Sequence, residues 1–528
     1  LELAKQDIQI HLENGLIKVN SPKGKLSKTL LNEVKANKSD LITYLSNKDK
    51  NVVQDISPVP LQENYSLSSA QYRLWVLSQV EDVSVSYNMP FTIPLENFTK
   101  IQCFEKALYS VIERHEILRT LFKPDGEGII KQWVVARETL NFSVRRINLI
   151  KEKDKKAAIE LYVSSDTYKP FDLTKGPLLR ATLFQLSNSC FVFYLNMHHI
   201  IGDAWSTDIL SRDLFSFYNH YAFKKALNLP NLRIQYKDYA SWQQQQIKTT
   251  RFTSHKKYWS KQLSGNLSKI DLPSVKKRPF IKTNAGRRLT TYIDKKHTYN
   301  IKRYVDKNGG TIFMMLMASL KVLFHRYTGL DDITLGTVVA GRNHIDLEDQ
   351  LGFYVNTLPI RSHINSSSPF NIFYKEIKRT ILEAYSHQEY PFNLIVEDTP
   401  SEWDSSRSIF FDILIVFQNK RKKMDHIGVT KDQMNTISEE GIIGSKFDIV
   451  FTFEENSEYI YMEVDYNTDV YDYDVIVNLI NHFKIMLLSI TDGGNQPIKK
   501  LVLLSESDKK QLLKEFNNTK VEYDLEKT

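Results

Sequence analysis

The sequence has few cysteines, no long apolar run and no leader-like start. Cys103 and Cys190 are the only cysteines, which excludes a disulfide scaffold and a cysteine-rich zinc site. The richest apolar stretch, residues 312–324, contains Lys321 and falls short of the roughly 18 apolar residues of a membrane span. No basic segment followed by an apolar core marks a signal peptide. We therefore expect a cytoplasmic protein that has reduced thiols and no contact with a membrane.

Charge of one sign is also scarce. The 528 residues include 70 basic and 62 acidic side chains, and a surplus of +8 is too small for this length to indicate nucleic-acid binding. Apolar residues make up 42% and charged residues 25%, and 28 Phe and 27 Tyr provide large core side chains. Composition therefore excludes a disordered chain, a collagen-like fibre and a coiled coil.

The first fifty residues form a unit of their own. Alternating apolar residues at 8–12 and 16–19 flank Asn14-Gly15, the strongest short signal for a β-hairpin. Apolar positions at 30–34 and 41–45 predict two short helices. Residues 51–64 are polar and contain two prolines, which is typical of a linker.

The rest of the chain alternates strand-like and helical segments. Residues 191–195 and 411–417 are continuous apolar runs, as expected for strands buried on both faces. Residues 207–221 have helical apolar spacing. We predict a mixed α/β fold, and more than 430 residues is too many for one core, so two lobes are expected. Because the chain begins with Leu1 rather than Met, we expect a piece of a longer protein.

The segment from Met197 to Ser206 places two imidazoles and a carboxylate between a buried strand and a helix that Ser206 is predicted to cap. A metal site is not expected, since neighbouring strand residues point to opposite faces and no HExxH or cysteine partner exists. Two alternatives remain open on the residues alone. His198 and His199 are satisfied core histidines, or one of them faces a cavity and transfers a proton.

Other catalytic signatures are absent from the sequence. No GxSxG nucleophile motif occurs, and no cysteine stands beside a histidine. No GxxxxGK[ST] segment or strand-linked GxGxxG occurs either, so a nucleotide-binding fold is not expected.

Residues 198–206 read HHIIGDAWS, and six more segments flank them in a fixed order. These are SAQYRLW at 69–75, RHEILRTLF at 114–122, YKDYASW at 236–242, GFYVNT at 352–357, HQEYPF at 387–392 and SRSIFFD at 406–412. Together they resemble the motif set of the condensation domains of non-ribosomal peptide synthetases, over about residues 65–501.

Two positions depart from the family motifs. Ala204 stands where the central motif has Gly, which would cost about 1 kcal/mol if that position required a positive φ. Ser408-Ile409 replaces Asn-Pro, and we interpret that change as structural.

Residues 1–50 resemble the N-terminal docking domains of the tubulysin-synthetase type, on the segments IHLENGL at 10–16 and SPKGKLS at 21–27. That family adds a C-terminal segment of the preceding synthetase subunit to a sheet edge. Lys18, Lys23, Lys25 and Lys28 cluster around and after the hairpin, so we expect an acidic partner tail. The alternative is a solvated basic face.

The resemblance implies a fold of two chloramphenicol-acetyltransferase-like lobes in a V. They would be an N-terminal lobe at 65–235 and a C-terminal lobe at 236–501, with 502–528 leading toward a missing adenylation domain. It also implies amide formation between a donor acyl or peptidyl thioester and an aminoacyl acceptor. Both groups would be held on the phosphopantetheine of partner carrier proteins, with no cofactor bound by this chain.

By the same resemblance, His199 is the tunnel-facing residue, either a general base or a group that orients the amine. His198 and Asp203 are expected to support it, and Asp203 is expected to pair with Arg342. Trp205, Asn356, Gln418 and Asn419 are weaker tunnel candidates, for which packing is the favoured interpretation.

Three other functions share parts of this pattern. Epimerisation domains share HHxxxD but differ in the later motifs, and heterocyclisation domains replace both histidines with Asp. A non-catalytic binding module tends to lose the histidine pair, which this chain keeps at 198 and 199. Residues 87–90 favour a peptidyl donor over a starter fatty acid, while the donor and acceptor themselves stay open.

Overall fold

A computed structural model describes residues 9–13, 16–20, 34, 38, 41, 55–79, 84–95, 100–400, 404–418, 437–493 and 496–519. For residues 9–16, 19, 20 and 440–442 it describes no side chain. Two compact units divide the chain, Leu1–Ser57 and Pro58–Thr528. The lobe boundaries expected within the second unit stay a prediction.

The first unit contains the predicted hairpin. Strands β1 (Gln9–Glu13) and β2 (Leu16–Asn20) pair antiparallel, in a register that runs from Gln9 opposite Asn20 to Glu13 opposite Leu16. This register leaves a two-residue connection at the Asn-Gly pair, as the turn chemistry predicts. The two helices predicted at 30–34 and 41–45 lie almost entirely outside the described residues.

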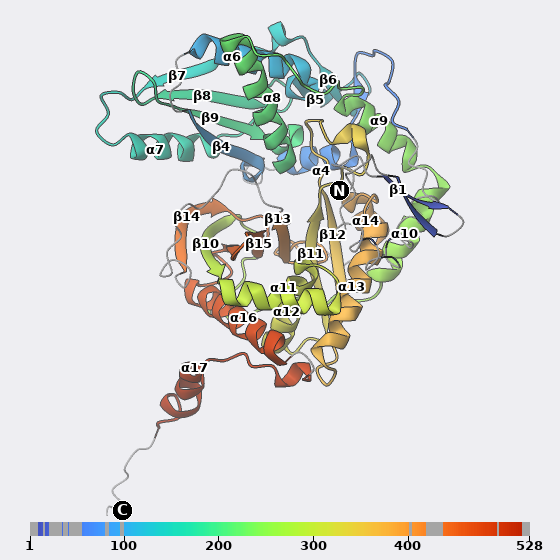
Figure 1. Ribbon diagram of the computed structural model, residues 1–528, viewed down its shortest axis with the longest axis vertical. Helices are drawn as coiled ribbons and strands as arrows, with labels where there is room; N and C mark the ends of the chain where they lie inside the picture. Colours follow the sequence, from blue (N-terminus) through green and yellow to red (C-terminus); the bar gives the residue numbers. More distant parts are fainter. Residues whose placement is uncertain are drawn as a thin grey trace, which may run out of the picture. The chain divides into compact units, whose positions relative to one another are not determined.

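The N-terminal part of the second unit is built around a four-stranded sheet of order β4-β9-β8-β7 and a three-stranded sheet of order β3-β6-β5 (Figure 1). Its strands are β3 (Tyr65–Ser66), β4 (Asn88–Leu95), β5 (Thr120–Pro124), β6 (Ile130–Val134), β7 (Val144–Asn148), β8 (Leu179–Gln185) and β9 (Phe191–His198). Its helices are α4 (Ser69–Ser78), α6 (Ile101–Arg114), α7 (Lys155–Thr167) and α8 (Ala204–Phe223), with the short turns η1 (Val85–Tyr87), η2 (Glu116–Arg119), η3 (Arg137–Leu140) and η4 (His199–Ile201).

Strand β9 is buried on both faces, as its apolar run predicts. Phe193 lies 4.9 Å, centroid to centroid, from Phe104 of α6, and the next residue, Tyr194, lies 5.8 Å from Tyr162 of α7. Because successive side chains on a strand alternate, α6 and α7 cover opposite faces of this sheet. His198 has the same parity as Tyr194, so it continues the α7 face of the strand.

The C-terminal part contains a seven-stranded mixed sheet of order β12-β11-β13-β15-β16-β10-β14 (Figure 1). Its strands are β10 (Ala285–Ile293), β11 (Asp332–Val339), β12 (Asn356–His363), β13 (Ile413–Gln418), β14 (Ser438–Gly444), β15 (Ile449–Glu455) and β16 (Ile460–Asn467). The helices are α9 (Tyr236–Gln246), α10 (Thr250–Gln262), α11 (Lys295–Asn308), α12 (Ile312–Thr328), α13 (Phe370–Ser386), α14 (Phe392–Asp398), α16 (Tyr473–Gly493) and α17 (Glu506–Lys510), with the turns η5 (Ile345–Leu347), η6 (Ile498–Lys500) and η7 (Gln511–Glu515).

Helix α12 is the predicted buried helix. Even its lysine, Lys321, is fully buried, and its ammonium donates to the carbonyls of Ile333 and Ile360 at 2.7 and 2.6 Å. Among the described residues, α16 is the one helix long and apolar enough to match a membrane span. Seven of its side chains, from Ile476 to Ile490, are buried in the hydrophobic core around the large sheet, so we interpret α16 as a core helix.

The predicted fold class is confirmed, since helices and mixed sheets alternate through both parts of the second unit. The predicted strand at 411–417 is shifted, because β13 begins at Ile413. Phe411 instead fills the space beside Gly336 of β11, where an added Cβ would lie 2.0 Å from the Phe411 ring.

Candidate active site

The paired histidines lie where β9 ends and α8 has not yet begun. His198 is the last residue of β9, and η4 turns the chain before the helix. Asp203 caps α8, since its Oδ1 accepts the backbone N–H of Ser206 at 2.8 Å. The prediction that Ser206 is the cap is therefore wrong. Its hydroxyl instead donates to the same carboxylate at 2.8 Å, which fixes the loop that carries His199.

His198 is fully buried and serves the loop. Its Nδ1 accepts the backbone N–H of Ile200 at 3.2 Å, and its Nε2 has no hydrogen-bond partner. Phe171 packs edge-on against the ring, with 6.2 Å between the ring centroids. Burial, followed by the charge of Lys446, lowers the pKa of His198 to about 3, so its imidazole is neutral at physiological pH.

His199 has a fixed tautomer. Its Nδ1 lies 2.9 Å from the carbonyl oxygen of Gly202, and a carbonyl can only accept, so Nδ1 carries the proton. Nε2 therefore holds a lone pair, and it makes no hydrogen bond to any described part of the chain. Burial, then the charge of Lys446, lowers the pKa of His199 well below its ordinary value. The half-buried ring is thus a neutral acceptor.

Rings and cations surround His199. Phe353 and Tyr87 stand edge-on to it, with ring centroids at 5.1 and 6.4 Å. The Lys446 ammonium lies 4.4 Å from the centroid of the Tyr87 ring. Sequence analysis missed Lys446, which follows β14 and belongs to none of the motifs. No pattern in the sequence could have placed it beside residues from the N-terminal part.

Asp203 and Arg342 form a buried ion pair, as the motif resemblance implied. Nη2 of Arg342 lies 3.0 and 3.2 Å from the two carboxylate oxygens, and each side chain is 1% exposed. The guanidinium also stacks over the Tyr354 ring at 4.2 Å and donates to the carbonyl of Gln350 at 2.6 Å. The pair joins the start of α8 to the loop after β11. The supporting role of this pair and of His198 stays a prediction.

Two of the weaker tunnel candidates are engaged in structural contacts. Trp205 is 43% exposed, and its indole N–H donates to the carbonyl of Glu348 at 3.0 Å. The amide of Asn356 donates to the carbonyls of Gln388 and Tyr390 at 2.8 and 2.7 Å and accepts the N–H of Phe392 at 3.0 Å. These contacts support the packing interpretation.

The remaining predicted residues are only partly described. Gln418 is the last residue of β13 and is half-buried, whereas Asn419 lies outside the described residues. Lys18 is exposed on β2, opposite His11. Lys23, Lys25 and Lys28 also lie outside the described residues, so the basic cluster stays a prediction.

The departures from the family motifs are structurally mild. Ala204 is the first residue of α8 and is not among the residues with positive φ, so the strain considered for it does not arise. The backbone N–H of Ser408 donates to Asp412 at 3.0 Å, and its hydroxyl accepts from Lys282.

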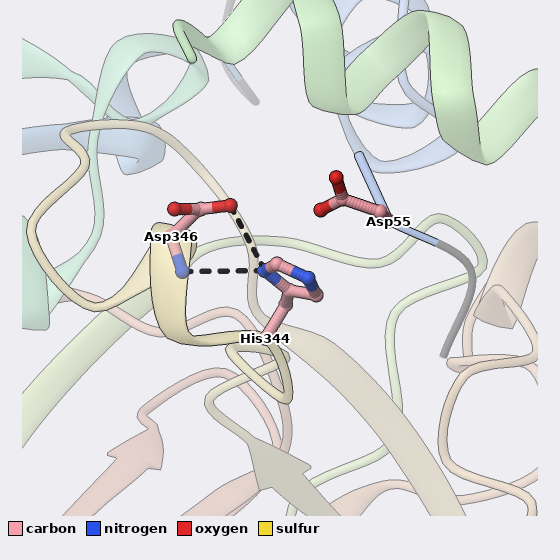
Figure 2. Close-up of side chains that lie close together, drawn as sticks. All are labelled: Asp55, His344 and Asp346. Carbon is pink, nitrogen blue, oxygen red and sulfur yellow. Dashed lines mark hydrogen bonds and ion pairs between the residues drawn. The ribbon is translucent and has the colours of Figure 1, made fainter. Parts of the chain in front are cut away.

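His344 and Asp346 form a contact outside this loop, at η5 (Figure 2). His344 Nδ1 accepts the backbone N–H of Asp346 at 3.2 Å and lies 3.4 Å from its carboxylate. Arg233 Nε also donates to this carboxylate, at 3.1 Å. These contacts fix the loop after Arg342. Two ligand residues are too few for a structural metal site, and Asp55, also drawn, belongs to the first compact unit.

A cavity of about 950 Å³ lies beside η1 and β4. Its lining includes Ser86, Asn88, Val163, Thr167 and Ile443, from η1, β4, α7 and β14. It is large enough for a drug-sized ligand and has few charges on the side nearest Tyr87. A neutral imidazole acceptor beside a cavity of this size is the arrangement of an acyl-transfer centre.

Comparison with known proteins agrees with this class. Residues 61–513 match the family model of the condensation domain, and residues 1–47 match that of the TubC N-terminal docking domain. The chain therefore belongs to the condensation-domain family, the acyltransferase-like domains that form amide bonds in non-ribosomal peptide synthetases, and it begins with a docking domain.

The curated relatives are large synthetases. The chain is 33% identical over 476 residues to a linear gramicidin synthase of Brevibacillus parabrevis, covering 89% of this chain and 6% of the relative. It is 33% identical over 484 residues to tyrocidine synthase 3 of the same organism, covering 92% and 7%. The chain thus spans less than a tenth of the length of either relative.

Solved structures share the fold. The X-domain from teicoplanin biosynthesis superposes with a TM-score of 0.75 at 22% identity, covering 85% of this chain and 100% of that one. The starter condensation domain of rhizomide synthetase gives 0.68 at 19% identity, covering 84% and 100%.

Proposed function

We propose that this chain joins a donor acyl or peptidyl thioester to the amine of an aminoacyl acceptor, with both groups delivered on the phosphopantetheine of carrier proteins. The observation that carries this proposal is the fixed tautomer of His199. Its Nδ1 proton is donated to Gly202, which leaves the Nε2 lone pair available to an incoming amine.

Positioning supplies most of the catalysis in this proposal. Two tethered groups that meet beside one imidazole react in an effectively unimolecular step, which contributes about 7–11 kcal/mol in well-oriented cases. The cavity beside η1 offers room for the donor chain. His199 then holds the amine by its N–H, so that the nitrogen lone pair faces the thioester carbon.

The lowered pKa of His199 favours the orienting role over proton storage. A weakly basic imidazole holds a proton only briefly, so the proton lost by nitrogen passes through Nε2 to the departing thiolate. The C–N bond forms, the C–S bond breaks, and the products are an amide and a free phosphopantetheine thiol. No additional reactant is needed.

His198, Asp203 and Arg342 act as positioning residues in this proposal. The Asp203 carboxylate holds the first turn of α8, and Arg342 holds that carboxylate from the other side. His198 fixes the turn that follows it through the N–H of Ile200. Together they set the place of His199 without touching the substrate.

The docking module is proposed to receive the C-terminal segment of the upstream synthetase subunit. A two-stranded sheet has edges to which an extended peptide can add a further strand. Lys18, exposed on β2, favours an acidic peptide. We further propose that the chain works in the cytoplasm, in cis with an adenylation domain that loads the acceptor residue.

The test is intact-mass measurement of carrier proteins in a reconstituted reaction. A donor-loaded upstream carrier with its C-terminal tail and an acceptor-loaded downstream carrier are mixed with wild type or with His199→Ala. Wild type should move the donor onto the acceptor, and the variant should do so at least about a hundredfold more slowly.

His220→Ala is the matched control. Its ring makes the same type of contact, with Nδ1 2.9 Å from the Lys225 carbonyl oxygen, at the far end of α8. Carrier binding by wild type without transfer would reject the proposed function in favour of a binding module. Transfer at equal rates by His199→Ala would reject the role of His199.

A further inference from the structure

Lys446 is the cation nearest the histidine loop that has no defined task. It lies on the connection between β14 and β15, with its ammonium 4.4 Å from the centroid of the Tyr87 ring. The Tyr87 ring stands 6.5 and 6.4 Å from the rings of His198 and His199, centroid to centroid. The charge of Lys446 reaches both imidazoles and lowers the pKa of each.

No carboxylate among the described residues forms an ion pair with this ammonium. The charge of Asp465 on β16 acts on it, but that carboxylate is held by Arg288 through two hydrogen bonds of 2.7 and 2.9 Å. Arg73 of α4 adds a second positive charge nearby. Burial and the charge of Arg73 lower the pKa of Lys446 to about 8.

The other acidic group of the site is also occupied. Asp203 pairs with Arg342 and accepts hydrogen bonds from Ser206, so it does not neutralise Lys446. Positive charge therefore remains around Tyr87 and the two imidazoles. A half-buried cation without a counter-ion is unfavourable in the resting site and gains most when negative charge arises beside it.

Amide formation creates such a charge. When the acceptor nitrogen bonds to the thioester carbon, the carbonyl π pair moves to oxygen and leaves an oxyanion. On collapse that pair re-forms the carbonyl, the C–S bond breaks, and the thiolate takes the proton released by nitrogen through His199. The oxyanion exists only between these events, so a cation facing it lowers the barrier selectively.

The geometry points to Lys446 as a further catalytic residue, whose ammonium stabilises this oxyanion beside His199. The inference rests on the proposed function and adds a group to it. Arg73 and Tyr87 are positioning residues in this scheme. Tyr87 holds the Lys446 ammonium over its ring, and Arg73 keeps the pocket positive.

The test is the single-turnover rate of donor transfer at saturating carrier concentrations, for wild type, Lys446→Met and Lys446→Arg. Removal of one oxyanion-stabilising group lowers such rates by about 10²–10³-fold, and we expect about a hundredfold loss for Lys446→Met. Carrier affinity should stay unchanged, because the charge acts only during the reaction. Transfer by wild type keeps the proposed function separate from this inference.

Lys484→Met is the matched control. Burial lowers the pKa of Lys484 to about 8 as well, but its ammonium donates to Thr291 in the large sheet, at 2.7 Å. The control should transfer the donor at the wild-type rate.

A pH profile separates a catalytic from a structural role. The protonated ammonium is the active form, so the wild-type rate should fall as pH rises above about 8. Lys446→Arg should keep the rate within about tenfold and lose this alkaline decline, since a guanidinium stays charged there. This readout remains informative even where Lys446→Met fails to fold.

Three results would overturn the inference. One is a Lys446→Met rate within about threefold of wild type. Another is a weaker affinity for either carrier with an unchanged saturated rate. The third is a loss confined to donors with an acidic side chain, which would make Lys446 a subsite for a substrate carboxylate.

Discussion

The two parts of the second unit contain the same local structure with different chemistry. In one, β9 is followed by residues 199–203 and α8; in the other, β16 is followed by residues 468–472 and α16. Each strand lies between two antiparallel partners. Each ends on a buried polar residue, His198 or Asn467.

The connections differ in the side chains that follow. Thr468 occupies the position that corresponds to His199, and its backbone N–H bonds to Ala285. Asp472 corresponds to Asp203, but it is about one-third exposed and pairs with the surface residue Lys276 at 2.9 Å. The backbone of this unit is thus compatible with a purely structural use. The imidazole and a buried carboxylate make one copy a candidate active site.

His199→Thr copies the structural connection into the active one and should have the largest effect. We expect donor transfer to fall at least about a hundredfold, because the Nε2 acceptor is removed. The melting temperature should change little, since His199 is half-buried and bonds only to Gly202. Intact-mass kinetics and a thermal melt check this. Thr468→Ala should leave transfer unchanged.

Asp203→Ala and Asp472→Ala should separate the buried from the exposed ion pair. Removal of Asp203 leaves Arg342 charged in a site that is 1% exposed, and we expect a loss of about 3–5 kcal/mol in the free energy of unfolding. Asp472→Ala should cost no more than about 1 kcal/mol. Urea denaturation measures both. Equal losses would show that burial does not distinguish the two connections.

His198→Asn copies the strand end of β16 and should alter the acid dependence of stability. The pKa of His198 is about 3 in the folded protein and 6.5 when unfolded, so lowering the pH protonates only the unfolded state. Its neutral burial thus contributes stability that is lost as pH falls below 6.5. Between pH 7.5 and 5.5 wild type should lose about 1 kcal/mol more than the variant. An identical acid loss in both proteins contradicts this.

Ala204→Gly should have the smallest effect. Since Ala204 is exposed at the start of α8, without positive φ, Gly is expected to destabilise the protein by about 0.5–1 kcal/mol. Donor transfer should stay within about twofold of wild type. A gain of activity would show that the Gly of the family motif has a function beyond backbone conformation.

The sequence predicted the family, the fold class and the partner of Asp203 because these follow from local patterns and ordered motifs. The hairpin register also follows from its Asn-Gly turn. The helix cap at Asp203 was missed, since both Asp203 and Ser206 are good caps and only the backbone path decides between them. Lys446 was missed because its place beside Tyr87 depends on tertiary packing between segments far apart in the chain.

The Asp203–Arg342 pair has a consequence for movement. The carboxylate lies one residue after Gly202, whose carbonyl holds the His199 ring, and the guanidinium lies on the loop after β11. Any separation of the two sheets must break this pair or turn about it, and turning leaves the buried charges together. The pair is therefore the natural pivot of such a motion. Wider entry for the carrier arms can then be achieved at the periphery while the reacting groups keep their spacing.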